Sequence, residues 1–218
     1  MDLDFSRPLI MIFIGKQASG KSFLLRNLIY QLTKQNTFKF GKVFSATSFN
    51  PDYDFMPEKH VDGDYSEHKL ELYIDSLKKW MTNNPGKKLP PSFLILDDLL
   101  GKIHQNSDVF SNLMSTYRHF NMTVFITSQY MVRSISTLLR ELADVAFIFK
   151  SKFKNTRTSL YEAFGQSLES QDEFDDVLEK ATKERHACLV YKANEEKVQD
   201  MYLSFKCPGN DPKFKLKF

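Results

Sequence analysis

A single octapeptide near the N-terminus constrains this chain more than any other feature. The apolar run at residues 8–14 (PLIMIFI) ends at residues 15–22 (GKQASGKS), and residues 23–32 then carry apolar side chains at helical spacing. The octapeptide matches G-x-x-x-x-G-K-[ST], a loop whose backbone N–H groups surround an anion together with the positive end of the following helix. The sequence therefore predicts a strand, a phosphate-binding loop and a helix in succession.

Every residue of this loop is a candidate contact for a polyphosphate. The eight residues are Gly15, Lys16, Gln17, Ala18, Ser19, Gly20, Lys21 and Ser22. We expect Lys21 to reach the β- and γ-phosphates, and the Ser22 hydroxyl to be a ligand of the Mg²⁺ that bridges them. The pattern also fits a glycine turn before an ordinary helix, but the strand before it and the amphipathic helix after it favour phosphate binding.

Two adjacent carboxylates follow another strongly apolar run. Residues 92–96 (SFLIL) lead directly into Asp97 and Asp98. An apolar strand that ends in an acid is typical of a Walker B segment, so we expect Asp97 to bind Mg²⁺. Asp98 can accept a proton from an attacking water, which makes it the candidate catalytic base. An acid pair also fits a solvated turn at a strand end, but the phosphate loop favours the metal-binding interpretation.

A glutamine ends the next predicted strand, because residues 121–128 (NMTVFITS) are followed by Gln129. Apolar strands alternate with helical segments along the chain. This alternation predicts a mostly parallel sheet covered by helices on both sides, with ligands at the carboxyl ends of the strands. The phosphate loop, the two aspartates and Gln129 all fall at such ends. We therefore expect Gln129 to contact the γ-phosphate and the attacking water.

The order of the segments predicts an α/β fold, a P-loop NTPase three-layer sandwich of the additional-strand (ASCE) class. Further strands are expected at 42–47, 145–149, 187–191 and 201–205, helices at 67–82, 108–120, 135–142 and through most of 158–183, and a surface loop at 48–65. With 218 residues, 42% of them hydrophobic, the chain suits one core better than two. We expect a single domain, with a core at about 7–150 and a C-terminal extension at about 151–218.

Composition excludes several classes of protein. The two cysteines, Cys188 and Cys207, and the scattered histidines have no zinc-site spacing, so neither a disulfide framework nor a metal cluster is expected. No apolar run approaches the about 18 residues of a membrane span, and Asp2 and Asp4 stand where a signal peptide would be positive. We expect an intracellular protein that is not secreted and has no membrane segment. The net charge of +3 is compatible with nucleic acid without establishing it.

Four segments together resemble a known family. The segments GKQASGKS, SFLILDD, YRHFNMTVFITSQ and LLRELADVAFIFK occur in this order. Their combination looks like the poxvirus-type genome packaging ATPases of large DNA viruses, virophages and related elements, within the FtsK/HerA superfamily. The resemblance covers roughly residues 9–150. The Arg-His pair before the glutamine strand separates it from a generic P-loop protein.

The resemblance implies a motor that uses ATP and Mg²⁺ to translocate double-stranded DNA into a preformed capsid. It also implies a homo-oligomeric ring, capsid or portal-vertex proteins as partners, and a place in the virion or at the viral assembly site in the host cytoplasm. In such rings an arginine of one subunit completes the neighbour's site. Arg118 is the first candidate for this arginine and Arg140 the second, although a surface or helix-capping role fits both.

DNA translocation without sequence preference needs phosphate contacts from lysine and arginine. Residues 150–157 and the tail from Lys206 carry such charges. Each patch alone also fits a solubilising face, and its aromatic residues also fit packing anchors. Together with the motor motifs, residues 150–157 are the favoured pore or DNA loop.

Two other classes of function are compatible with the phosphate loop. One is a small-molecule P-loop kinase that phosphorylates a nucleoside or nucleotide. Such kinases usually close an arginine-rich lid over the phosphates, and Arg133, Arg140 and Arg157 are too dispersed to form an obvious one. The other is an adaptor that is switched by a nucleotide without hydrolysing it.

Overall fold

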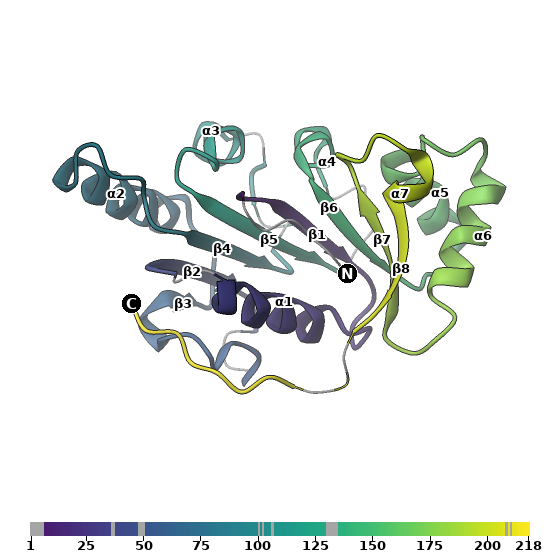
Figure 1. Ribbon diagram of the computed structural model, residues 1–218, viewed down its shortest axis with the longest axis horizontal. Coiled ribbons are helices and arrows are strands. Elements are labelled where there is room, and N and C mark those ends of the chain that lie inside the picture. The colour runs from purple at the N-terminus through teal and green to yellow at the C-terminus, as the bar shows by residue number, and fades with distance from the viewer. Residues whose placement is uncertain are drawn as a thin grey trace.

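A central sheet of eight strands organises the computed structural model, which describes residues 7–35, 38–47, 51–99, 101, 103–105, 107–129, 135–207, 209 and 211–218. In chain order the strands are β1 (Ile10–Ile14), β2 (Phe40–Ser45), β3 (Val61–Asp62), β4 (Ser92–Asp97), β5 (Met122–Ser128), β6 (Val145–Phe149), β7 (Ala187–Lys192) and β8 (Tyr202–Lys206). Across the sheet their order is β3-β2-β4-β5-β1-β6-β7-β8 (Figure 1). The strands β3, β2, β4, β5, β1 and β6 are each parallel to their neighbours in this group. Strand β7 runs antiparallel to β6, and β8 runs antiparallel to β7. The predicted α/β fold is confirmed.

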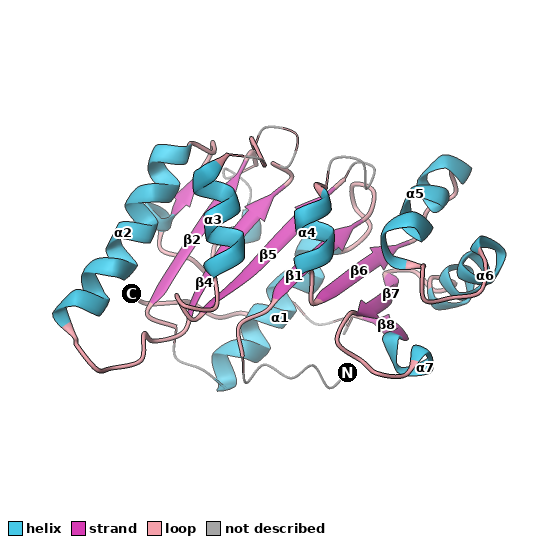
Figure 2. Cartoon of the chain, turned by 90° about the horizontal axis from the view of Figure 1, so that it is seen from above, coloured by secondary structure: helices cyan, strands magenta, loops and turns pink. Residues whose placement is uncertain are grey.

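Helices cover both faces of the sheet. They are α1 (Lys21–Gln35), α2 (Glu67–Asn83), α3 (Asp108–Thr116), α4 (Thr137–Leu142), α5 (Lys154–Phe164), α6 (Gln171–Ala181) and α7 (Val198–Met201), with short 3₁₀ turns at η1 (Pro51–Tyr53) and η2 (Glu58–His60). Figure 1 shows α1 and the yellow C-terminal tail on one face, and Figure 2 shows α2, α3 and α4 lying over the other. Within the described residues, no helix combines the length and apolar character needed to cross a membrane.

Alternate residues of β1 enter two different cores. Ile10, Ile12 and Ile14 pack on the face that carries α2 and α3. Met11 and Phe13 pack on the face that carries α1, where Phe13 stacks on Phe147 of β6 with ring centroids 4.7 Å apart. Parallel strands need this burial on both faces, and β1 has it because it lies inside the sheet, between β5 and β6.

Three expectations about elements are corrected. The loop expected at 48–65 contains η1, η2 and β3, because Phe55 and its apolar neighbours are buried against α1. The helix expected at 108–120 ends at Thr116, because the chain turns at Asn121 (φ 44°) to enter β5. The helix expected after residue 158 is two helices, since Gly165 ends α5 and the Ser170 side chain caps α6.

The C-terminal tail at 211–218 packs along the α1 face. Phe214 stacks on Phe55 at 4.8 Å, and the Leu216 N–H donates to the Phe55 carbonyl at 2.7 Å. Arg26 of α1 holds both segments, because its Nε donates to the Pro212 carbonyl at 3.1 Å and its Nη1 pairs with Asp54 at 2.5 Å. The aromatic residues of the tail are therefore packing anchors.

Asp144 binds several segments at one edge of the sheet. We call this edge, at the amino ends of the parallel strands, the amino edge. The carboxylate is 4% exposed and accepts hydrogen bonds from Ile10 N at 2.9 Å and from the Tyr117 hydroxyl at 3.0 Å. Arg118 Nη2 at 3.4 Å and Arg7 Nη1 at 3.3 Å pair with the same carboxylate. The start of β1, the end of α3 and the start of β6 therefore share one buried acid.

Asp144→Ala should lower the free energy of unfolding by roughly 2 to 4 kcal/mol, because it leaves a buried N–H and a buried hydroxyl without an acceptor. The measurement is urea denaturation followed by circular dichroism. Asp75→Ala is the matched control, since Asp75 is 67% exposed and pairs with Lys78 on the same helix. The control should change stability by less than about 0.5 kcal/mol. Equal effects of the two variants would contradict the role given to Asp144.

Candidate functional site

The predicted phosphate loop forms a tight turn between β1 and α1. The Gly15 N–H donates to the Ser128 carbonyl at 3.1 Å, which ties the start of the loop to the end of β5. A Cβ at Gly15 would lie 2.7 Å from the Cβ of Phe149, so glycine is required there. Ala18 (φ 58°) and Gly20 (φ 110°) both have left-handed backbone conformations. The loop curls back on itself and leads into the first turn of α1, where N–H groups have no helical acceptor.

Lys21 is the first residue of α1, and its side chain folds back onto this loop. Its ammonium donates to the carbonyls of Gly15 at 2.8 Å and Lys16 at 3.0 Å, and the residue is 6% exposed. Burial lowers the pKa of Lys21, and the negative charges of Asp98 and Asp97 oppose this shift. A buried cation near two carboxylates is well placed to bind a polyphosphate.

Two residues on the neighbouring strands hold Asp97 in place. The register pairs Asp97 with Ser45 of β2 on one side and with Thr127 of β5 on the other. The Ser45 hydroxyl donates to Asp97 Oδ2 at 2.7 Å, and the Thr127 hydroxyl donates to Oδ1. Burial and the charge of Asp97 raise the pKa of the nearby Tyr53 well above its usual value, which keeps that hydroxyl neutral. Asp97 is therefore fixed at the end of β4.

Asp98 and Gln129 contact each other at the carboxyl edge, the edge opposite to that of Asp144. The Gln129 side-chain amide donates to Asp98 Oδ2, while Oδ1 is buried without a hydrogen-bond partner among the described residues. Asp98 has a left-handed backbone (φ 54°), and its N–H donates to the Thr127 hydroxyl at 3.1 Å. Burial raises the pKa of Asp98, as does Asp97, while the Gln129 hydrogen bond and Lys21 oppose the shift. A raised pKa suits a carboxylate that must take a proton.

These residues line one cleft of about 700 Å³ at the carboxyl edge. Its lining includes Gln17, Ala18, Gly20, Lys21, Ser22, Phe23, Thr47, Asp52, Asp97, Asp98, Gln129, Arg185, His186, Lys206, Cys207 and Gly209. The structure thus brings together Lys21, Ser22, the two aspartates and Gln129, as expected. Lys16 lies beside this cleft, with its ammonium 4.7 Å from the Phe153 ring.

The two arginine candidates are not part of this cleft. Arg118 is at the amino edge, where its Nε donates to the Tyr117 hydroxyl at 2.9 Å and its Nη2 pairs with Asp144. Arg140 is on α4 and donates to the Thr137 hydroxyl at 3.1 Å. Either side chain could act only on the nucleotide of a neighbouring subunit, and that role stays a prediction. Arg133 lies outside the described residues.

Several residues that line the cleft or hold its lining residues in place were missed by the sequence reasoning. Ser45 and Thr127 are short polar residues near the ends of apolar strands, which is a visible signal in the sequence. Connecting them to Asp97 requires knowing that their strands flank β4. Asp52, Arg185, His186 and Lys206 reach the cleft from segments far away in the chain. No local pattern distinguishes these residues from other surface charges.

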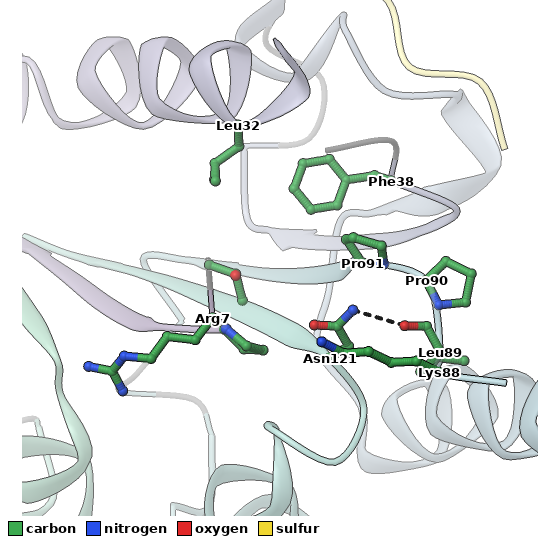
Figure 3. A pocket seen from close by; sticks show the side chains of 10 residues that line it. Arg7, Leu32, Phe38, Lys88, Leu89, Pro90, Pro91 and Asn121 are labelled. Atoms are coloured by element: carbon green, nitrogen blue, oxygen red, sulfur yellow. Dashed lines mark hydrogen bonds between the residues drawn. The ribbon is translucent and has the colours of Figure 1, made fainter. Parts of the chain in front are cut away.

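A second cleft, of about 310 Å³, opens at the amino edge (Figure 3). Figure 3 shows Asn121 donating to the Leu89 carbonyl beside Pro90 and Pro91, an interaction of 2.8 Å. The ionisable residues of the lining are Arg7 and Lys88, and the lining contains no carboxylate among the residues that the structure describes. The cleft at the carboxyl edge is therefore the better candidate for chemistry.

The donors at the carboxyl edge fit Mg²⁺ bound together with a nucleotide. Among the described residues there is no cluster of three His, Cys, Asp or Glu side chains that could hold a metal by itself. Mg²⁺ does not require one, since it commonly binds through one or two protein oxygens, waters and substrate phosphates. Asp97 and the Ser22 hydroxyl are the protein oxygens in position to take part.

Comparisons with known proteins agree with this fold. A family model described as Poxvirus A32 protein matches residues 4–157. Protein L437 of Acanthamoeba polyphaga mimivirus is 28% identical over 231 residues, covering 98% of this chain and 78% of that protein. The structure of the genome packaging NTPase B204 from Sulfolobus turreted icosahedral virus 2, in complex with AMPPCP, matches with a TM-score of 0.64 at 14% sequence identity. The match covers 87% of this chain and 95% of the B204 chain. The structure of the pCW3 conjugation coupling protein TcpA matches with a TM-score of 0.62 at 14% sequence identity, and the match covers 89% of this chain and 60% of the TcpA chain. These likenesses confirm the predicted P-loop ATPase fold.

Thr127→Val should raise the Mg²⁺ concentration needed for half-maximal nucleotide binding by about 10- to 100-fold, because groups that orient a metal ligand have effects of this size. The same change removes one of the two acceptors of Asp98 N–H and leaves the other, the Thr127 carbonyl at 3.2 Å. Titration calorimetry at a series of Mg²⁺ concentrations measures the shift.

Thr123→Val is the matched control for this variant. Thr123 is buried on the same strand but lines the cleft at the amino edge. It should leave the Mg²⁺ dependence unchanged. If the two valine variants behave alike, Thr127 does not position Asp97.

Proposed function

The chain belongs to the poxvirus A32 protein family, and on that premise we propose that it is an ATPase that packages double-stranded viral DNA into a preformed capsid. The observation that carries the proposal is the single cleft in which Lys21, Asp97, Asp98 and Gln129 meet. The cofactors are ATP and Mg²⁺. The site of action is the virion or the viral assembly site in the host cytoplasm.

Five side chains in the cleft have roles in hydrolysis. Lys21 and the loop N–H groups bind the β- and γ-phosphates, which positions the terminal phosphate. Asp97 and Ser22 would hold Mg²⁺, which would neutralise charge on the phosphates. Asp98 Oδ1 has no partner among the described residues, so it can take the proton of an attacking water. Gln129 contacts Asp98 and orients that water, and its position allows it to respond to the γ-phosphate.

Three features support the coupling of hydrolysis to DNA. The structural likeness includes a genome packaging NTPase and a conjugation coupling protein. Lys150 and Lys152, which follow β6, and Lys154, the first residue of α5, are exposed next to the 62% exposed Phe153. The loop expected at 150–157 therefore ends at Phe153, directly before this helix begins. This patch lies at the carboxyl edge beside the phosphate loop, where it can contact DNA phosphates without reading bases. We propose that it faces the channel of a homo-oligomeric ring that docks on capsid or portal-vertex proteins.

The kinase alternative receives no comparable support. Arg157, one of the three arginines considered for a lid, donates to the Ser151 carbonyl at 3.1 Å and lies 3.8 Å from Asp175. It is therefore engaged at the start of α5 and is not extended over the cleft. The adaptor alternative predicts binding without turnover, which the next experiment tests.

Purified protein should hydrolyse ATP with Mg²⁺, and duplex DNA of any sequence should accelerate hydrolysis at low salt. Phosphate release, measured with and without DNA, tests this. Lys21→Ala should lose ATP binding, while Asp98→Asn should still bind ATP but lose at least about 100-fold in turnover. Hydrolysis that duplex DNA leaves unchanged, in a protein that stays monomeric with an ATP analogue, would argue against a packaging motor. Phosphate transfer to a nucleoside would favour the kinase instead, and a fully active Lys21→Ala variant would favour the adaptor.

If Arg118 acts on the neighbour's ATP, Arg118→Ala should lower ATP turnover by about 10³-fold or more. Mixing this variant with Lys21→Ala should restore part of the rate, because mixed rings contain interfaces with an intact Lys21 and an intact arginine. Arg7→Ala is the matched control, since Arg7 pairs with the same Asp144. Similar activities of the Arg118→Ala and Arg7→Ala variants would assign Arg118 to the Asp144 contact alone. Arg140→Ala, tested in the same mixtures, would then be the remaining candidate.

A further inference from the structure

The turn before β7 lies against the phosphate loop. Because β7 runs antiparallel to β6, the start of β7 is at the carboxyl edge, where Cys188 pairs with Phe149. Phe149 is also the residue that a Cβ at Gly15 would strike. The topology of the sheet therefore holds residues 183–186 beside the loop, although they follow it by more than half of the chain.

His186 binds this turn to the loop. Its Nδ1 lies 3.2 Å from the Ser19 carbonyl oxygen, and since a carbonyl oxygen only accepts, Nδ1 carries the proton and donates. His186 also has a left-handed backbone (φ 62°), a costly conformation for a residue with a side chain. An ion pair between Lys206 and Glu184 ties the turn to the end of β8. The turn thus contacts both the phosphate loop and the end of β8.

Arg185 lies in this turn, at residues 183–186, and lines the cleft. Its side chain is exposed, and it forms no hydrogen bond or ion pair with any part of the chain that the structure describes. A guanidinium group has five N–H donors and a flat face. Both are available to a ligand in the cleft.

The strand order places Arg185 and the two aspartates at opposite ends of the cleft. Asp97 ends β4 and Arg185 precedes β7, with β5, β1 and β6 between them. At about 4.8 Å between neighbouring strands, this separation is roughly 19 Å. Lys21 and the loop lie between the two ends. A triphosphate whose γ-phosphate faces Asp97 and Asp98 therefore directs its nucleoside toward Arg185.

We propose that Arg185 binds the nucleoside of ATP by stacking its guanidinium on the face of the base, an inference that rests on the proposed function. Guanidinium planes stack on nucleobases, and this contact accepts any base because each has a π-face. The C-terminal extension then builds the nucleoside end of the site, whereas β1, β4 and β5 build the phosphate end.

The experiment compares a ligand that carries a nucleoside with a ligand that does not. Titration calorimetry with Mg²⁺ measures the Kd of AMPPCP and the Kd of inorganic tripolyphosphate. Arg185→Ala should raise the Kd of AMPPCP by roughly 3- to 30-fold and leave the Kd of tripolyphosphate within about twofold of the wild type. Arg185→Lys, which keeps the charge and loses the plane, should behave like the alanine variant.

Equal weakening of both ligands by Arg185→Ala, with rescue by Arg185→Lys, would overturn the stacking contact and indicate a phosphate contact. Unchanged binding of both ligands would overturn it as well. Lys183→Ala is the matched control, because it removes one exposed charge from the same turn without touching the cleft. A wild-type chain that binds neither ligand overturns the proposed function and this contact with it. Normal wild-type binding with an unaffected Arg185→Ala variant overturns this contact alone.

Discussion

The hydrogen bond from Gly15 N to the Ser128 carbonyl is the contact on which the site depends. It closes the end of β1 onto the end of β5, while Phe149 of β6 closes on Gly15 from the other side. Three neighbouring strands therefore converge on one glycine that has no room for a side chain. Because β1 is buried on both faces, the sheet cannot shift without moving both cores. The packing of these strands around Gly15 consequently sets the position at which the phosphate loop begins.

The parts of the site that could be predicted are those in which one short stretch of sequence sets both the local structure and the chemistry. Lys21 follows its strand within a recognisable loop, and Asp97 and Gln129 directly follow apolar runs. Once the strands were expected to be parallel, their carboxyl ends had to share an edge. The cleft then followed from topology, without knowledge of any side-chain contact.

What could not be predicted depends on pairings between distant segments. Ser45 and Thr127 bind Asp97 only because β2 and β5 flank β4 in register. Arg185 reaches the cleft only because β7 reverses direction, and neither strand order nor direction is encoded in a local pattern. Arg118 shows the opposite case. Its assignment came from a resemblance, and its position beside Asp144 leaves a role in its own subunit's cleft without structural support.

The left-handed residues at the cleft have a consequence for the evolution of this fold. Ala18, Asp98 and His186 are three of the four non-glycine residues with positive φ that the structure describes. Each conformation costs about 1–2 kcal/mol, against a total stability that is typically about 5–15 kcal/mol. Selection for heat resistance alone would favour glycine or asparagine at these positions, so stability and activity should trade off most sharply at this one edge of the molecule.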